Sequence, residues 1–201
     1  MKIASTLSRL VNTRAVYMVA LADDCRTAER TQSTGVHLVP VTWENVNDVA
    51  KVRGDATAQT MRQLLVDGAL GVYVYMDGEF AGHFWGVHSG NEIKRMWGGV
   101  DYGPDEVLLC WGWVDHERRG LGLFQSLIGA LVNRVRDEIG SIRIVADVPV
   151  DPLASLAAHR RMGFRLTGRL EYVRVLRKLV SRKEVPMDDS AAEPLLRHKS
   201  P

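Results

Sequence analysis

The residue types best suited to chemistry in this chain lie in a short basic segment between an apolar strand and a helix. The segment contains Arg118, Arg119, Gly120 and Gly122, and it follows the apolar and aromatic residues 107–114. A basic, glycine-containing turn before a helix directs free backbone N–H groups and the positive end of the helix dipole at an anion. Glycine is favoured there because a Cβ atom would keep a phosphate group away from the backbone. The segment therefore predicts a binding site for pyrophosphate.

Two common phosphate-binding motifs do not fit this segment. A kinase-type phosphate loop ends in Gly-Lys-Ser or Gly-Lys-Thr, which the chain lacks. A dinucleotide fingerprint needs glycine or alanine where Gln125 lies, although Asp147 closes the next apolar strand roughly where a ribose-binding acid would lie. The upstream chain is also typical of an antiparallel meander rather than of a βαβ unit. We therefore keep a dinucleotide-binding oxidoreductase only as the last of three hypotheses.

The segment resembles the acetyl-CoA motif of the GCN5-related N-acetyltransferases, which reads Gln/Arg-x-x-Gly-x-Gly/Ala after a central strand. Arg119 and Gly122 match the first and fourth positions, and Phe124 stands at the sixth. A second motif of the family, Asn-x-x-Ser-x-x-x-Tyr followed by Gly-Phe, resembles residues 151–164. The motifs occur in the family's order, and together with the strand layout they cover residues 37–176.

The second motif matches at three positions and departs at two. Ser155, Gly163 and Phe164 match, whereas Pro152 replaces the asparagine and His159 replaces the tyrosine. A histidine at that place is similar to the phosphinothricin-acetyltransferase branch of the family.

The resemblance implies an α/β fold of the α+β type, known as the GNAT fold. Its central sheet is mixed and mostly antiparallel, contains a splayed parallel strand pair and is flanked by helices. Residues 106–114 and 142–147 are the expected pair, and Gly112 is the expected position of the bulge that starts the splay. The pantetheine arm of acetyl-CoA would pair with the free strand edge.

The resemblance also implies which residues bind acetyl-CoA, which acts as a co-substrate without a metal ion. These residues are Trp113, Val114, Arg118, Arg119, Gly120, Leu121, Gly122, Leu123, Phe124 and Ser155.

The implied reaction is direct transfer of an acetyl or other acyl group to the primary amine of a small molecule. Its main catalytic requirements are positioning and oxyanion stabilisation, with proton transfer in addition. His159 stands where the family's tyrosine protonates the leaving thiolate, so we expect it to act as the acid. Glu106, at the start of the central strand, is the first candidate for the base. Further candidates for the base are His83, Asp101, Tyr102, Asp115 and His116.

Aromatic side chains are numerous on the side of the sheet where the acceptor is expected, and they include Trp85, Trp97, Tyr102 and Trp111. They either stack on a sugar ring or pack in an ordinary core. We favour an amino sugar or an amino-acid-like compound over a protein tail as the acceptor. The alternative to an enzyme is a non-catalytic acyl-CoA-binding module that acts as a sensor or in assembly.

Composition fits a globular domain of 201 residues, with 46% hydrophobic and 25% charged residues. The net charge of +2 is too small to indicate nucleic acid as a partner. No apolar run is long enough to span a membrane, so a cytoplasmic location is expected, and a homodimer is compatible with the sequence. Cys110 lies in the apolar strand and is expected in the core.

The organisation expected along the chain has three parts. Residues 1–36 form an N-terminal extension, a helix or edge strand plus a loop; residues 37–177 form the acetyltransferase domain; and residues 178–201 form a polar, disordered tail. Within the domain, helices are expected at 43–52 and 56–66, a hairpin at 71–86 and a helix after 122. The residues predicted to cap or end these elements are Thr42, Gly68, Asp77-Gly78, Asp151 with Pro152 at the first helical position, and Gly163.

Overall fold

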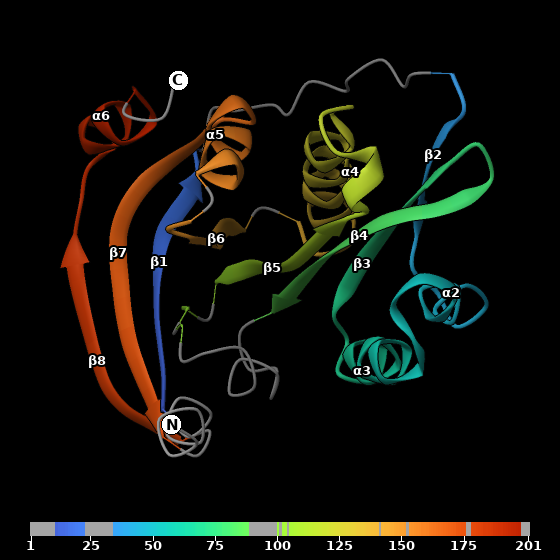
Figure 1. The fold of residues 1–201 in the computed structure, drawn as a ribbon, viewed down its shortest axis with the longest axis horizontal. Coiled ribbons are helices and arrows are strands. Elements are labelled where there is room, and N and C mark those ends of the chain that lie inside the picture. The colour runs from blue at the N-terminus through green and yellow to red at the C-terminus, as the bar shows by residue number, and fades with distance from the viewer. Residues whose placement is uncertain are drawn as a thin grey trace, which may run out of the picture.

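Eight strands form one mixed sheet in the part of the chain that the structure describes (Figure 1). The computed structural model describes residues 11–22, 34–88, 100, 102–103, 105–140, 142–151, 153–175 and 178–197. The strands are β1 (Val11–Leu21), β2 (Val36–Pro40), β3 (Leu70–Met76), β4 (Glu79–His88), β5 (Glu106–Val114), β6 (Arg143–Pro149), β7 (Phe164–Val175) and β8 (Lys178–Pro186). Their order across the sheet is β2-β3-β4-β5-β6-β1-β7-β8.

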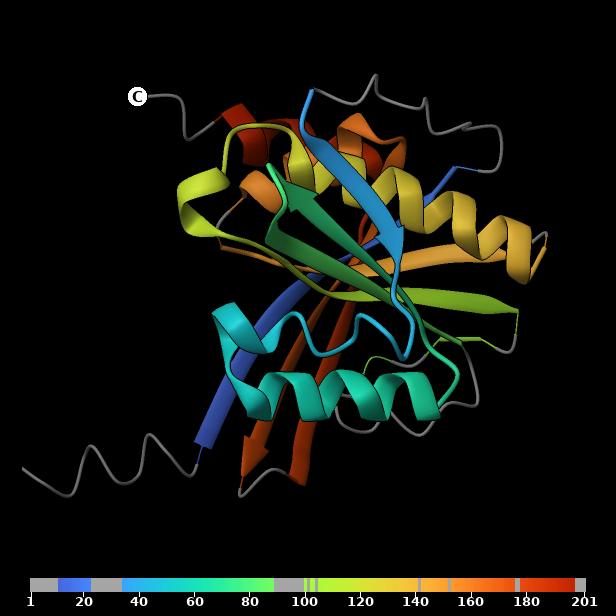
Figure 2. The ribbon, with the colours of Figure 1, turned by 90° about the vertical axis from the view of Figure 1, so that its right-hand side faces the viewer.

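Helices cover both faces of this sheet, as Figure 2 shows. We call the face covered by α4, α5 and α6 the α4 face, and the face covered by α2 and α3 the α3 face. The helices are α2 (Ala50–Arg53), α3 (Asp55–Val66), α4 (Leu123–Glu138), α5 (Ala154–Arg161) and α6 (Ala192–Arg197), with the short 3-10 helices η2 (His116–Arg118) and η3 (Asp189–Ala191). Each face buries its own cluster of apolar side chains.

Turn residues position several elements as predicted. Asp77 and Gly78 have φ angles of 53° and 82°, and two positive φ angles at the centre of a two-residue loop are the signature of a type I′ hairpin turn. Gly68 follows α3 at φ 74° and Gly163 follows α5 at φ 87°, so both helices end at a glycine that tolerates the left-handed conformation. The predicted hairpin and α3 are therefore confirmed. The predicted bounds of β5 are confirmed as well.

Two predicted helix starts were wrong. Residues 43–49 form turns, and the helix there is only α2. The side chain of Asn45 accepts the N–H of Thr42 and donates to the carbonyl of Pro40, and such local bonds compete with helix formation. The helix after β6 begins at Ala154 with Leu153 as its N-cap, so Asp151 does not cap it; Pro152 lies outside the described residues.

The two ends of the chain also differ from expectation. β1 pairs with β6 on one side and with β7 on the other, so it is an interior strand rather than an edge strand. β8 pairs with β7 along most of its length, and α6 buries Ala192 fully against the α4-face cluster, so this part of the expected tail is ordered. The sheet therefore extends well beyond residues 37–177 in both directions.

The central feature of the sheet is the parallel pair β5–β6, whose register runs only from Glu106↔Arg143 to Leu109↔Ala146. Beyond Leu109, β5 continues to pair with β4, and beyond Ala146, β6 continues to pair with β1. Residues 110–114 and 147–149 therefore leave two strand edges that face each other without a shared ladder. This opening is the predicted splay, and the predicted fold class is confirmed.

Candidate functional site

A bulge in β5 marks the start of the opening. His83 of β4 pairs with Trp113 and Trp85 pairs with Cys110, so two residues of β5, Trp111 and Gly112, oppose one residue of β4. Trp111 has a φ of 51°, which is unusual for a bulky side chain and is typical of functional sites.

Gly112 serves a second purpose at this bulge. A Cβ atom placed there would lie 2.6 Å from the ring of Phe124 and 2.9 Å from the ring of Phe84. Glycine is therefore required for the close approach of the α4 residue Phe124 to β5. Gly112 therefore lies in the predicted bulge and also allows α4 to pack closely on β5.

The predicted pyrophosphate site lies where β5 leads through η2 into α4. Gly120 and Gly122 both have positive φ angles, of 82° and 80°, and Gly122 is the N-cap of α4. A Cβ atom at Gly120 would meet no atom within 4 Å, so this turn faces open space. The first N–H groups of a helix have no carbonyl partner within it, and Gly122 provides no capping side chain. The turn therefore presents unpaired donors to an anion.

The two arginines of this turn have different surroundings. Nη1 of Arg118 donates to the carbonyl oxygens of Met76 and Glu79, at 3.4 Å and 3.2 Å, and so ties the turn to the β3–β4 hairpin. Arg119 is exposed, and its Nε donates to the carbonyl oxygen of Val114 at 3.4 Å. The structure thus leaves the charge of Arg119 near the turn, whereas Arg118 has a structural contact that the motif did not reveal.

The other residues predicted to bind acetyl-CoA can meet it mainly through their backbone. The side chain of Leu123 is buried and Phe124 packs on Phe84, while Leu121 is 54% exposed. The side chain of Trp113 lies on the α3 face, where it stacks on aromatic rings.

His159 lies on the α4 face within an aromatic enclosure. Its ring centroid is 5.3 Å from that of Phe164, 5.6 Å from that of Phe124 and 6.1 Å from that of Phe84. Its Nδ1 lies 2.8 Å from the carbonyl oxygen of Ser155, so Nδ1 carries the hydrogen. Burial lowers the pKa of His159 to about 4, and the carbonyl of Ser155 opposes this shift.

This environment argues against the predicted role of His159 as an acid. At neutral pH the ring is uncharged and its only hydrogen points at Ser155. Nε2 is buried and has no hydrogen-bond partner among the described residues. A neutral ring in this tautomer can accept a hydrogen bond through Nε2 but has no proton to give to a thiolate.

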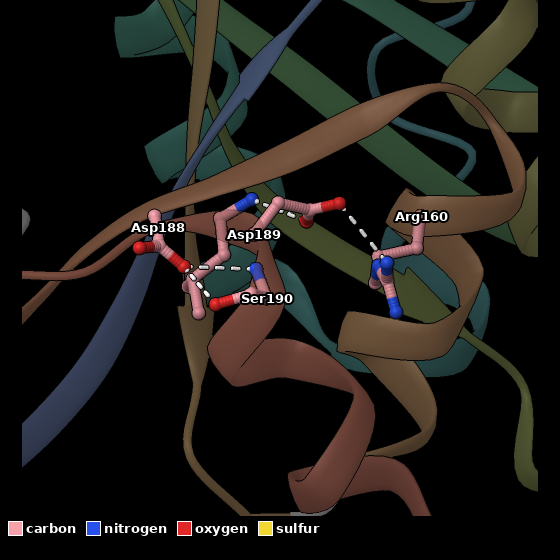
Figure 3. Close-up of polar contacts among 5 residues, drawn as sticks. Arg160, Asp188, Asp189 and Ser190 are labelled. Carbon is pink, nitrogen blue, oxygen red and sulfur yellow. Dashed lines mark hydrogen bonds and ion pairs between the residues drawn. The ribbon is translucent and has the colours of Figure 1, made fainter.

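The C-terminal segment contacts α5, the helix that carries His159, and Figure 3 shows this contact between Asp189 and Arg160. Asp189 accepts two contacts at 3.0 Å, one from Nη2 of Arg160 on α5 and one from the N–H of Leu166 on β7. Asp188 accepts the N–H of Ser190 and so caps η3. This contact was not predictable from the sequence, because the segment is short and mostly polar.

An aromatic cluster lies on the α3 face beside the bulge. The ring of His83 is within 6.5 Å of the rings of Trp111, Trp113, Phe80 and Tyr73. Burial lowers the pKa of His83 to about 3, the charge of Arg53 lowers it further, and the carbonyl of Trp111 opposes the shift. Neither ring nitrogen makes a well-formed hydrogen bond with a described residue. His83 therefore stays neutral and enclosed, which makes it a poor base.

Three polar side chains border this cluster. The guanidinium carbon of Arg53 lies 4.8 Å from the ring centroid of Trp113, in a cation–π contact. The hydroxyl of Tyr75 donates to Asp48 at 2.7 Å. Asp48 lies just before α2 and Arg53 lies in it, whereas Tyr75 lies on β3, and no motif pointed to them.

Glu106 is not part of this arrangement. Its carboxylate accepts the N–H of Gly103 and forms an ion pair with Arg143 at the paired end of β5 and β6. Six residues of strand separate it from Gly112, a span of about 20 Å. The first candidate for the base is therefore remote from the opening.

Three of the remaining candidates for the base lie within the described residues. Tyr102 donates to the carbonyl of His88, and burial raises the pKa of its hydroxyl to about 12. Asp115 begins the turn after β5 and His116 is exposed beside it. Asp101 and Trp97 lie outside the described residues.

One carboxylate beside the opening was not among the predicted site residues. Asp147 is the first residue of β6 beyond its pairing with β5, and sequence reasoning considered it only as a ribose-binding acid. The sequence does contain a signal, because Asp147 is an acidic residue directly after the apolar residues 144–146. Its importance depends on where the pairing ends, which the sequence does not state.

Within the described ranges, no group of three or more histidine, cysteine, aspartate or glutamate side chains is arranged to hold a metal ion. None of the helices described is both long and apolar enough to cross a membrane.

The sequence matches one family model, described as the acetyltransferase (GNAT) family, over residues 41–164. A comparison with curated proteins found no match.

Solved structures with the same fold include three of low identity. The tandem GNAT protein from the clavulanic acid biosynthesis pathway is 19% identical with a TM-score of 0.59, covering 88% of this chain and 55% of that one. A Drosophila protein is 16% identical with a TM-score of 0.59, covering 86% and 55%. A GCN5-related N-acetyltransferase-like protein from Streptococcus suis is 14% identical with a TM-score of 0.56, covering 86% and 67%. These likenesses show the fold, and this chain spans little more than half the length of the first two.

Proposed function

Because this chain belongs to the acetyltransferase (GNAT) family, we propose that it transfers an acetyl group from acetyl-CoA to the primary amine of a small molecule. The observation that carries the proposal is the opening between β5 and β6, which lies beside the glycine turn at the start of α4. An extended arm needs a free strand edge and a pyrophosphate needs unpaired N–H donors. The chain offers both next to each other.

Three parts of the chain fit acetyl-CoA. The N–H groups at the start of α4 suit the pyrophosphate, with Arg119 adding charge. The edge of residues 110–114 suits the amide groups of the pantetheine arm. When bound, acetyl-CoA would supply the activated acetyl group as a thioester. The bulge at Trp111 and Gly112 re-aims the backbone there, and an N–H group beside it is our candidate for stabilising the oxyanion.

The acceptor is proposed to approach from the α3 face. Trp111 and Trp113 are only half-buried there, while the α4 face beside the bulge is filled by Phe124, Phe84 and His159. Aromatic rings with a nearby cation and carboxylate favour a compact polar molecule with an apolar surface, such as an amino sugar or an amino-acid-like compound. His159 is then a packing residue of the opposite face.

The first experiment measures acetyl-CoA binding by titration calorimetry. Gly122→Val should weaken binding more than tenfold, above about 1.4 kcal/mol, because the branched side chain disturbs the turn where phosphate approaches. Gly140→Val is the matched control, since Gly140 has a similar positive φ of 95° at the opposite end of α4. Equal affinities for folded Gly122→Val and Gly140→Val would contradict the proposed cofactor site.

The second experiment measures release of free CoA with a panel of amino sugars, amino acids and simple amines. Release that depends on a primary amine supports the enzyme. Binding of acetyl-CoA without release for any amine would favour the non-catalytic acyl-CoA-binding module, for which the neutral state of His159 is the specific observation.

A further inference from the structure

Asp147 lies where the opening begins, and its side chain is on the α3 face, from which the acceptor is proposed to approach. Ala146 is the last residue of β6 to pair with β5, opposite Leu109, and Asp147 follows it while pairing with Met18 of β1. Side chains alternate along a strand, and Ala146 belongs to the α4-face cluster. Val145, two residues before Asp147, belongs to the α3-face cluster. The carboxylate is therefore directed to the α3 face.

The surroundings of Asp147 leave its carboxylate available. Cys110 pairs with β4 and is the first residue of β5 that no longer pairs with β6. Burial together with the nearby Asp147 raises the pKa of its thiol. The charged or titratable groups that face Asp147 are Arg14 of β1 and Cys110 of β5. The carboxylate forms no hydrogen bond or ion pair with another residue of the described ranges. It is only half-buried, so a substrate can reach it.

The pKa of the Asp147 carboxyl group suits proton transfer. Burial raises the pKa of Asp147 to about 6, while its own backbone N–H and the charge of Arg14 oppose the shift. A base works best when its pKa lies near the working pH. At pH 7 to 8 Asp147 is mostly ionised and holds a proton more readily than an exposed carboxylate would.

We propose that Asp147 is the general base that takes a proton from the ammonium group of the acceptor. This inference rests on the proposed function. It gives Asp147 the role of the base, for which Glu106 was the first candidate from the sequence. The carboxylate takes one proton from the ammonium and leaves a neutral amine. The nitrogen lone pair then forms the C–N bond to the acetyl carbon as the C–S bond breaks. The nitrogen gives its second proton to the departing thiolate, and Asp147 returns its proton to water.

The kinetic test uses Asp147→Asn, which keeps the shape and removes the base. Its kcat/KM at pH 7 should fall by roughly a hundred- to ten-thousand-fold, the usual range for a positioned base. The acidic limb near pH 6 in the wild-type profile should be lost, and the dissociation constant for acetyl-CoA should change less than about threefold. Asp137→Asn is the control, because Asp137 is an exposed carboxylate of α4. If the wild-type protein is active and Asp147→Asn has the same rate and pH profile, this inference is wrong while the proposed function stands.

A second readout does not need activity. A carboxyl group with a raised pKa binds its proton more tightly in the folded state, so it favours folding at low pH and loses that effect as pH rises through about 6. The melting temperature of Asp147→Asn should therefore increase relative to wild type between pH 4 and pH 7. A difference that stays constant over this range contradicts the proposed environment of Asp147. Absence of wild-type CoA release with every amine overturns the proposed function and this inference together.

Discussion

Glu106 and Asp147 are carboxylates at opposite ends of one strand pair, and their surroundings are opposite as well. Glu106 lies where β5 and β6 are paired, and it has the N–H of Gly103 and the side chain of Arg143 as partners. Asp147 lies where the same two strands separate, and burial raises its pKa to about 6. Both side chains carry a carboxylate, so the difference in their surroundings comes from where the pairing between β5 and β6 ends. The carboxylate that we propose as the base is therefore the one at the unpaired end of these strands.

The same contrast applies to stability. The paired end is held by the ladder between residues 106–109 and 143–146. The open end has no such ladder and is held from outside the sheet, by Phe124 of α4 packing on Gly112 and by α5. Helix α5 in turn depends on the C-terminal contact through Asp189. We therefore expect the open end to be sensitive to distant changes.

The largest effect is expected from removing residues 187–201. The truncated chain loses the fully buried Ala192, the half-buried Leu195 and Leu196, and the two contacts of Asp189. The free energy of unfolding should fall by about 3–5 kcal/mol, measured by urea denaturation.

A pair of point variants separates this contact from mere chain length. Asp189→Ala should lower the free energy of unfolding clearly more than Asp188→Ala, because Asp189 contacts α5 and β7 whereas Asp188 caps only η3. An unchanged melting temperature in the truncated chain would show that α5 does not need this segment.

Local structure was predictable because its causes are local. The Asp77-Gly78 turn and the glycines after α3 and α5 each follow from the conformations that these residues tolerate. The bounds of β5 follow from its apolar run. By contrast, every residue of β8 is exposed, so no burial pattern distinguished this strand from a disordered tail.

The site was predictable only as far as the family motifs describe it. The turn of Gly120 and Gly122 and the bulge at Gly112 were found from motifs and glycine positions. The choice between Glu106 and Asp147 depends on the residue at which β5 and β6 part, a long-range register that one sequence does not contain. The burial of His159 among three phenylalanines depends on tertiary packing in the same way.

A smaller effect is expected from His159→Phe. If His159 were the acid that the sequence predicted, its removal would lower kcat by tenfold or more. The neutral, enclosed ring leads us to expect a change in kcat below about threefold, since no proton is transferred from it. The measurement is kcat for one confirmed acceptor beside Asp147→Asn. A hundredfold loss in His159→Phe with normal acetyl-CoA affinity would restore the acid role and place the chemistry on both faces of the sheet.

The smallest effect is expected from Glu106→Gln, which tests the paired end of β5 and β6. Glutamine keeps an acceptor for the N–H of Gly103 but removes the charge that pairs with Arg143. The side chain of Arg143 is 54% exposed, so water and salt already weaken the pair, and its loss should cost about 0.2–1 kcal/mol of folding free energy. Turnover and its pH profile should stay within about twofold of wild type, because Glu106 lies some six residues along β5 from the bulge. A large loss of kcat in Glu106→Gln, with the acidic limb abolished, would mean that the base lies at the paired end after all and that the opening only positions the substrate.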